Sequence, residues 1–211
     1  MSATKRAHAD DRDAADLFGS LPVIDEDANR RLHARLVAAA QADGLLDVAY
    51  RIVDTPVGGL LLAATDAGLV RIAFACQGYE QVLASLAETV SPRVLQASGK
   101  LDAVVREIDE YFAGTRTRFE VPLDYRLSAG FRRQVLARLV EIAYGETATY
   151  AAIAQRSGSP KAVRAVGSAC ATNPLPVVVP CHRVVRSDGT AGGYAGGPEA
   201  KLALLALEAA P

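Results

Sequence analysis

Residues 146–174 read ETATYAAIAQRSGSPKAVRAVGSACATNP, and we interpret them as two short helices, at about 147–156 and 160–171. Two short helices around a three- or four-residue turn that contains glycine are typical of a helix-turn-helix. Pro160 falls in the first turn of the second helix, where its missing N–H costs least. Helical hairpins also occur in cores that touch no DNA. The stretch predicts a helix-turn-helix in a mainly helical C-terminal domain, and the second helix of such a motif can enter a DNA groove.

The next stretch, residues 176–186, reads PVVVPCHRVVR and places Cys181 directly before His182. A free thiol is only about 3% thiolate at neutral pH, so a nucleophilic cysteine needs a base beside it. Adjacent side chains on an extended chain point to opposite faces, so a bend after Pro180 or a bridging water is needed. A buried cysteine beside an exposed histidine is the alternative. Four glutamates of this half could orient the histidine, and the sequence leaves the choice open: Glu141, Glu146, Glu199 and Glu208.

The N-terminal half has a different pattern. Residues 45–75 contain three short apolar runs, LLDVAYRIV, GLLLAAT and GLVRIAFA, separated by turn sequences. They predict an antiparallel three-stranded sheet, followed by helices at 79–89 and 99–113 and one more extended segment at 117–125. We therefore expect a small α/β domain here.

The first 43 residues begin as a polar tail and end in an amphipathic helix. Leu32, Leu36, Val37 and Ala40 have helical spacing, and Gly44 ends the pattern. The chain therefore divides into an N-terminal extension (1–43), an α/β domain (44–125) and a helix-turn-helix domain (126–211).

Composition limits the class of protein. Half of the 211 residues are hydrophobic and 22% are charged, as in globular proteins. No apolar run approaches the ~20 residues of a membrane span, and no secretory signal is evident. The three cysteines have no CxxC spacing and the three histidines are scattered, which argues against disulfides and against a zinc site. We expect a cytoplasmic protein, without membrane contact, metal or cofactor.

The net charge of −1 conceals an asymmetry between the two halves. Residues 126–211 hold ten basic and five acidic residues, a net charge of +5. Residues 1–125 hold thirteen basic and nineteen acidic residues, a net charge of −6. A chance imbalance on a solvated surface would look the same. Combined with the helix-turn-helix, the pattern favours an anionic partner such as DNA for the C-terminal half.

These motifs carry a resemblance to a known family. The sequence PCHRVV, preceded by YGETATY and AVRAVGSACATNPLPVVV and followed by GTAGGYAGG, resembles the active-site region of the O6-alkylguanine-DNA alkyltransferases. The resemblance is clear from Phe131 to Glu208 and weaker from Leu46 to Asp124, and it does not cover residues 1–43. It implies a ribonuclease-H-like α/β domain before a mainly helical domain with a winged helix-turn-helix. It also implies repair of double-stranded DNA containing O6-alkylguanine, by a monomer.

The resemblance assigns catalytic roles to five residues. It implies that Cys181 accepts the alkyl group and that His182 acts as its base through a water. Glu208, in the last helix, orients the histidine. Asn173 braces the helix-turn-helix against the active-site loop. Tyr150 reaches the flipped nucleotide and can donate a proton to the purine.

The resemblance also implies how DNA is held. The lesion lies inside the duplex, so the nucleotide must be rotated out, and Arg164 fills the gap. Tyr150 meets the phosphate, and small residues of the second helix let the backbone approach the minor groove: Ala162, Ala165, Gly167 and Ser168. The base pocket is expected to include Pro176, Val184, Tyr194, Ala195 and Gly196.

Some features depart from the family pattern. Ala195 stands where the family often has serine, which removes a hydroxyl near O6. No zinc ligand set is present in the N-terminal domain, and residues 1–43 contain no cysteine. Three other readings remain: an alkyltransferase-like protein that binds damage without transfer, a Cys-His hydrolase, and a transcription regulator. Alkyl transfer to Cys181 is the reading that uses all the motifs. O4-alkylthymine is a second lesion from which the alkyl group could be transferred.

Overall fold

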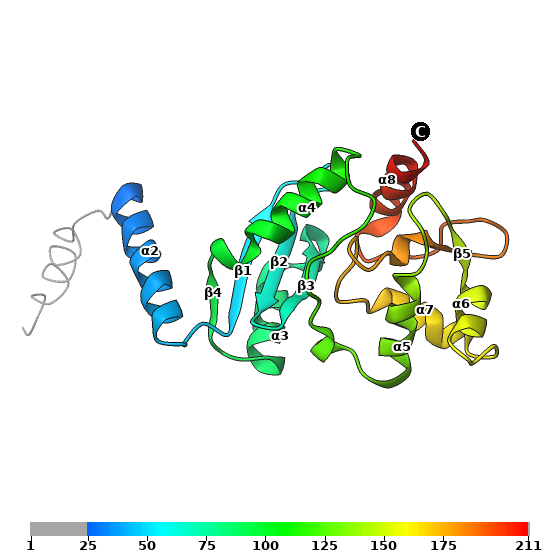
Figure 1. Cartoon of the computed structure of the whole chain (residues 1–211), viewed down its shortest axis with the longest axis horizontal. Coiled ribbons are helices and arrows are strands. Elements are labelled where there is room, and N and C mark those ends of the chain that lie inside the picture. Colours follow the sequence, from blue (N-terminus) through cyan, green and yellow to red (C-terminus); the bar gives the residue numbers. More distant parts are fainter. Residues whose placement is uncertain (1–24, 211) are drawn as a thin grey trace, which may run out of the picture.

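The computed structural model describes residues 25–210. The N-terminal half of the protein is organised around one sheet (Figure 1). Strands β1 (Val48–Val53), β2 (Leu60–Thr65) and β3 (Gly68–Phe74) pair antiparallel, as the three apolar runs predict. The prediction of a three-stranded sheet was wrong in the number of strands. A fourth strand, β4 (Val94–Gln96), pairs parallel to β1 and gives the order β3-β2-β1-β4. A strand of three residues is too short for its alternation to be recognised in sequence.

The sheet buries both faces under helices. All six residues of β2 are buried, and successive side chains point to opposite faces. Leu60 and Leu62 pack in the cluster that includes Ile108 of α4 (Asp102–Phe112). Leu61 packs in the cluster of α3 (Tyr79–Thr89). Both predicted helices are therefore confirmed, with short 3₁₀ turns at Ala75–Gln77 and Gly99–Leu101 before them.

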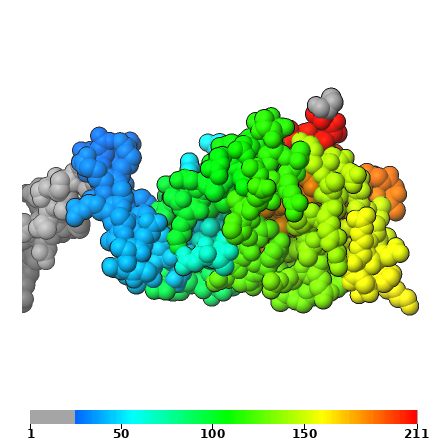
Figure 2. Space-filling view, in the orientation of Figure 1, coloured from blue at the N-terminus to red at the C-terminus, as the bar shows by residue number. Residues whose placement is uncertain are grey.

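The helix expected in the N-terminal extension is α2 (Glu26–Ala42), which begins after the capping residue Asp25. Only part of its predicted apolar stripe packs. Val37 and Ala40 contact the small cluster at the β4 edge of the sheet, whereas Leu32 and Leu36 are 52% and 55% exposed. Figures 1 and 2 show α2 at one end of the molecule. The expected tail, residues 1–24, lies outside the described residues.

The outer edge of β3 joins the two halves of the chain. The extended segment expected at 117–125 makes an isolated bridge there, Leu69 with Leu123, and then a 3₁₀ turn at Tyr125–Leu127. Pro122 in that segment has no N–H for a longer ladder. Further along β3, the N–H of Ile72 donates to the carbonyl of Pro174 at 2.7 Å. Backbone hydrogen bonds therefore fix the C-terminal half against the sheet.

The C-terminal half is mainly helical, as predicted. Its helices are α5 (Gly130–Leu139), α6 (Tyr150–Arg156), α7 (Val163–Ala171) and α8 (Gly197–Ala209). The short strands β5 (Ala148–Thr149) and β6 (Val184–Val185) pair parallel. Helices α6 and α7 form the expected helix-turn-helix, packed on α5.

Both helices of the motif start later than the sequence pattern indicates. Thr149 ends β5 and caps α6, since its Oγ1 accepts the N–H of Ala152 at 3.1 Å. Helix α7 begins at Val163, after a turn around Pro160. The boundary error is about one turn of helix in each case.

One apolar cluster runs through both halves. It includes Leu62 and Ile108 from the N-terminal half and Leu136, Val166 and Leu204 from the C-terminal half. Burial of such side chains is the main favourable contribution to folding. Within residues 25–210, none of the helices has the length and apolarity that crossing a bilayer would require.

Candidate functional site

The loop between α7 and Cys181 is held by Asn173. This buried side chain donates from Nδ2 to the carbonyl of Val179 at 2.9 Å and to Sγ of Cys181 at 3.1 Å, and its Oδ1 accepts the N–H of Leu175 at 3.0 Å. Within the loop, Val177 has φ 72°, a conformation that β-branched residues rarely adopt. Asn173 therefore fixes a strained loop and attaches the end of α7 to the thiol.

Cys181 begins a 3₁₀ turn (Cys181–Arg183) and is 2% exposed. Burial raises the pKa of its thiol to about 11, although the hydrogen bond from Asn173 and the charge of Lys201 act in the opposite direction. The resting thiol is therefore protonated at neutral pH. A nucleophile forms here only if a base takes the proton.

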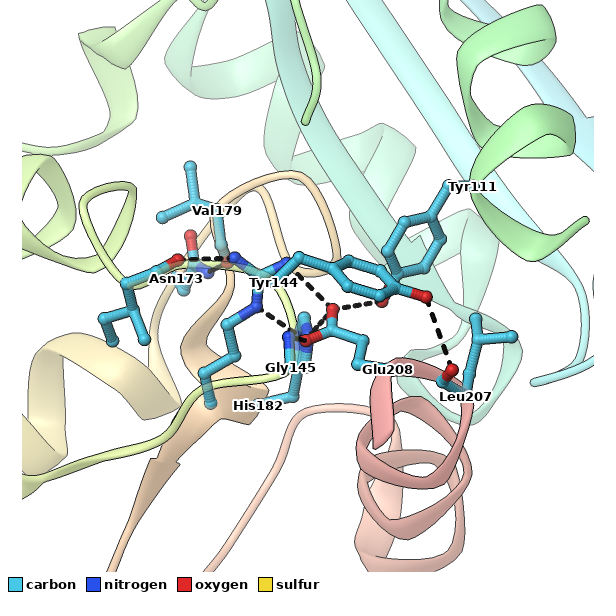
Figure 3. Close-up of polar contacts among 10 residues, drawn as sticks. Tyr111, Tyr144, Gly145, Asn173, Val179, His182, Leu207 and Glu208 are labelled. Carbon is cyan, nitrogen blue, oxygen red and sulfur yellow. Dashed lines mark hydrogen bonds and ion pairs between the residues drawn. The ribbon is translucent and has the colours of Figure 1, made fainter. Parts of the chain in front are cut away.

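Glu208 is the centre of a buried polar network (Figure 3). Its Oε1 accepts from Tyr111 Oη at 2.6 Å, His182 Nε2 at 2.9 Å and Arg183 Nη2 at 2.8 Å. Its Oε2 accepts from Arg183 Nε at 2.8 Å and from the N–H of Gly145 at 3.3 Å. Burial alone would raise the pKa of Glu208, but the hydrogen bonds from His182, Arg183 and Tyr111 hold it at about 2. The carboxylate is therefore charged and fixed.

His182 is placed by that carboxylate. It has no exposed surface, and Nδ1 has no hydrogen-bond partner among the described residues. Burial lowers the pKa of His182, although Glu208 raises it, so the ring is neutral at pH 7. Because Nε2 faces a carboxylate acceptor, it carries the proton. The lone pair on Nδ1 is then free to act as a base.

The structure selects one glutamate from the four candidates. Glu141, Glu146 and Glu199 are exposed, and only Glu208 is buried and contacts His182. Helix periodicity could not make this choice, because it depends on how α8 packs against the 3₁₀ turn.

A second part of the site is an open pocket of about 580 Å³ beside α7. Five predicted residues line it together: Tyr150, Arg164, Gly167, Tyr194 and Ala195. Burial raises the pKa of Tyr150 and that of Tyr194. The ring of Tyr194 meets the ring of His182 edge-on, with centroids 6.2 Å apart, so this wall of the pocket lies beside the Cys-His pair, although Cys181 does not itself line the pocket.

The remaining predicted residues do not line this pocket. Pro176 and Val184 are buried, and Gly196 is half-buried. On α7 and the turn before it, Ala165 and Ser168 are exposed and Ala162 is half-buried. The structure thus brings five of the predicted residues together at the pocket and places the others outside its lining.

Four residues of the site were not singled out in the sequence. Arg183 and Tyr111 bind Glu208, and Arg183 also donates to the carbonyl of Ile142 at 2.6 Å. Lys201 has no exposed surface, and its Nζ donates to the carbonyl of Val184 at 2.6 Å. Arg186 lines the pocket. Arg183 and Arg186 directly follow the Cys-His pair, but Tyr111 lies far from it in sequence, so only the fold shows its contact.

No group of three His, Cys, Asp or Glu side chains within residues 25–210 is arranged to hold a metal ion.

Comparison with known proteins shows which family has this fold and sequence. Residues 48–125 match the ribonuclease-like domain of 6-O-methylguanine DNA methyltransferase, and residues 130–210 match its DNA binding domain. The chain belongs to the 6-O-methylguanine DNA methyltransferase family. The matches confirm the resemblance and the expected fold class.

Individual relatives agree with that family. A methylated-DNA–protein-cysteine methyltransferase of Mycolicibacterium paratuberculosis is 42% identical over 161 residues, which are 76% of this chain and 92% of that protein. The crystal structure of an O6-methylguanine methyltransferase of Mycobacterium tuberculosis is similar with a TM-score of 0.69 and 39% identity, covering 78% of this chain and 95% of that one. A structure of the Mycobacterium tuberculosis OGT protein in complex with DNA has a TM-score of 0.66 at 38% identity, covering 76% and 92%.

Proposed function

We propose that this chain repairs DNA by direct reversal, moving the alkyl group of O6-alkylguanine onto Cys181. The observation that carries the proposal is the buried thiol beside the neutral His182, which is itself held by the charged Glu208. Membership in the 6-O-methylguanine DNA methyltransferase family supports the same reaction.

In this reaction His182 removes the thiol proton through a water, and Glu208 stabilises the imidazolium that forms. The Sγ of Cys181 attacks the alkyl carbon, an S–C bond forms, and the bond between that carbon and O6 breaks. The electron pair of the broken bond stays on guanine, and a proton from Tyr150 neutralises the base as it leaves. Asn173 holds Sγ in place during the attack.

DNA enters along α7. We infer that the exposed, small residues Ala165 and Ser168, with Gly167 and Ala162, let the duplex backbone approach the helix closely. The damaged nucleotide rotates into the pocket beside Tyr194 and Ala195, and Arg164 occupies the space that it leaves in the stack. Pro176, Val184 and Gly196 support the walls of that pocket.

The product is a thioether, which is stable, so each molecule should act once and without a cofactor. We expect a monomer in the cytoplasm that acts on the nucleoid. O4-alkylthymine is a second candidate lesion, since it also carries its alkyl group on an exocyclic oxygen.

We also propose the division of the chain into an extension (1–43), an α/β domain (44–125) and a helix-turn-helix domain (126–211). The limits of the two family matches, 48–125 and 130–210, support the last two. Helix α2 then belongs to the extension, although its C-terminal end packs on the sheet.

The deciding experiment is the intact mass of the protein after mixing with duplex DNA that carries one O6-methylguanine. We expect wild-type protein to gain one methyl group per chain and Cys181→Ala to gain none. Peptide mapping should place the methyl group on Cys181. Lack of a mass gain, with retained preference for the damaged duplex, would instead make the protein a damage-binding relative without transfer.

A further inference from the structure

The N-terminal sheet reaches the active-site loop at the end of β3. The ring of Phe74 is 3% exposed and meets the ring of Tyr194 edge-on, with centroids 5.5 Å apart and planes at 70°. Two residues later, Sγ of Cys76 donates to the carbonyl of Ala195 at 3.5 Å. Tyr194 and Ala195 both line the pocket beside α7. Phe74 and Cys76 therefore contact the outer side of a pocket wall.

Gly196 shows how tightly that wall is held. A Cβ at Gly196 would lie 2.6 Å from Cε1 of Phe74 and 2.7 Å from its Cδ1, closer than real Cβ contacts. The backbone there has φ −87° and ψ 7°, which other residues also adopt. The missing side chain, and not an unusual backbone angle, is therefore what this position requires. The ring of Phe74 and the loop backbone are in direct contact.

The same strand also holds the other side of the site. The N–H of Ile72 donates to the carbonyl of Pro174, the first residue of the loop after Asn173. One strand thus contacts both the loop that carries the thiol and the loop that carries Tyr194. Residues that line the pocket all come from the C-terminal half, between Tyr150 and Ala195. The N-terminal half contributes to the pocket through the position of its walls.

We propose that Phe74 is a positioning residue for alkyl transfer, which sets the distance between the Tyr194–Ala195 wall and Cys181 by its contact with Gly196. The inference rests on the proposed function. It assigns to the sheet a part in the geometry of the pocket, beyond its contribution to the core. Because a shift of about 1 Å in a reacting pair can cost about a hundredfold in rate, a change in one ring contact is measurable.

The test is a pair of substitutions with opposite steric effects. Gly196→Ala adds the Cβ that clashes with the ring, and Phe74→Ala removes the ring. Each should lower the methyl-transfer rate constant at saturating duplex by about tenfold, the first by pushing the wall and the second by releasing it. In the Phe74→Ala background, Gly196→Ala should cost less than about twofold, because the added Cβ enters the vacated space.

Two readouts separate positioning from loss of folding. Affinity for unmodified duplex should stay within about twofold of wild type in all variants, because Arg164 and the exposed face of α7 are unchanged. Phe74→Leu keeps apolar bulk against the loop and should retain the rate within about threefold. Gly99→Ala is the matched glycine control, since a Cβ there meets no atom within 4 Å and Gly99 does not line the pocket.

The outcomes are distinct. If the two substitutions lower the rate independently, so that the double variant shows their full product, the contact does not set the wall and the inference fails. Equal losses of duplex affinity and of rate would also overturn it, because they would indicate general disorder of the domain. Failure of the wild-type chain itself to take up methyl would overturn the proposed function first, and this inference with it.

Discussion

The network around Glu208 and the face of α7 are two regions of the same site that differ in burial and in how fully their polar groups are paired. In the network, both carboxylate oxygens are occupied by donors, and the side chains of Glu208, His182 and Arg183 are buried. On the face of α7, Arg164 and Ala165 are exposed, beside an open pocket. The buried network, which is the closed part of the site, fixes the protonation states of its groups. The exposed face of α7, which is the open part, leaves room for a charged ligand such as DNA.

This difference predicts which substitutions affect both folding stability and alkyl transfer and which affect transfer alone. Changes in the network alter folding stability and transfer together, because a buried charge that loses its partner destabilises the fold. Changes on the open face alter transfer from DNA and leave stability almost unchanged, because solvent already surrounds those side chains.

Glu208→Gln should have the largest effect. It leaves the Arg183 guanidinium buried without its carboxylate, at a cost of about 3–5 kcal/mol in the free energy of unfolding. It also removes the carboxylate that orients His182 and stabilises the imidazolium formed when the ring takes the thiol proton, so single-turnover methyl transfer should fall by at least about a hundredfold. Urea unfolding and quenched single-turnover assays measure the two effects.

Glu199→Gln is the matched control, since Glu199 is exposed in the first turn of the same helix. Its unfolding free energy should stay within about 0.5 kcal/mol of wild type. A Glu208→Gln protein with wild-type stability would show that the network is not the closed structure described above.

The closed part was also the harder one to predict. The family resemblance assigned roles to Cys181, His182, Asn173 and Glu208, and the structure places these residues in two contacting pairs. Tyr111 lies in the helix predicted at 99–113, and its hydroxyl donates a hydrogen bond to Glu208, 97 residues further along the chain. A buried aromatic gives the same periodic signal whether or not its hydroxyl has a partner.

The fold followed from local patterns wherever elements were long. The three apolar runs and the helices at 79–89 and 160–171 are recognisable because their side chains alternate or repeat over several residues. The strand Val94–Gln96 and the bridge at Leu123 exist because of pairing partners distant in sequence. These segments are extended because they pair with distant strands, and a short window of sequence does not include those partners.

The second prediction concerns the resting thiol. In the free protein, iodoacetamide at pH 8 should modify Cys181 at least about a hundredfold more slowly than a free cysteine, because burial raises its pKa to about 11. Cys76 is exposed and should react first. Peptide mass mapping over time measures each rate. Early modification of Cys181 would mean that its surroundings are open, as the α7 face is.

The third prediction tests the open face. Arg164→Ala should lower transfer from damaged duplex about tenfold, because nothing then fills the stack when the nucleotide leaves it. Transfer from a single strand with the same lesion should fall less, since it has no paired stack to maintain. Arg156→Ala, an exposed arginine at the end of α6, is the control. Equal losses on both substrates would assign Arg164 to phosphate contact alone.

The smallest expected effect is that of Tyr111→Phe. It removes one of the donors to Glu208 and leaves the ring in the core, so stability at neutral pH should fall by about 1 kcal/mol. With one donor fewer, the pKa of Glu208 rises from about 2 towards its ordinary value of 4.5. The stabilisation due to a lowered carboxyl pKa is complete above the unfolded value and is lost as pH falls through the folded one.

The difference in unfolding free energy between wild type and Tyr111→Phe should therefore be constant above about pH 5 and shrink between about pH 4.5 and 2. Tyr144→Phe provides the comparison, because its hydroxyl donates to the carbonyl of Leu207 at 3.3 Å and not to Glu208. Its cost should not change with pH over that range. If both variants showed the same pH dependence, the hydroxyl of Tyr111 would not act through the carboxylate, and the network would end at Arg183 and His182.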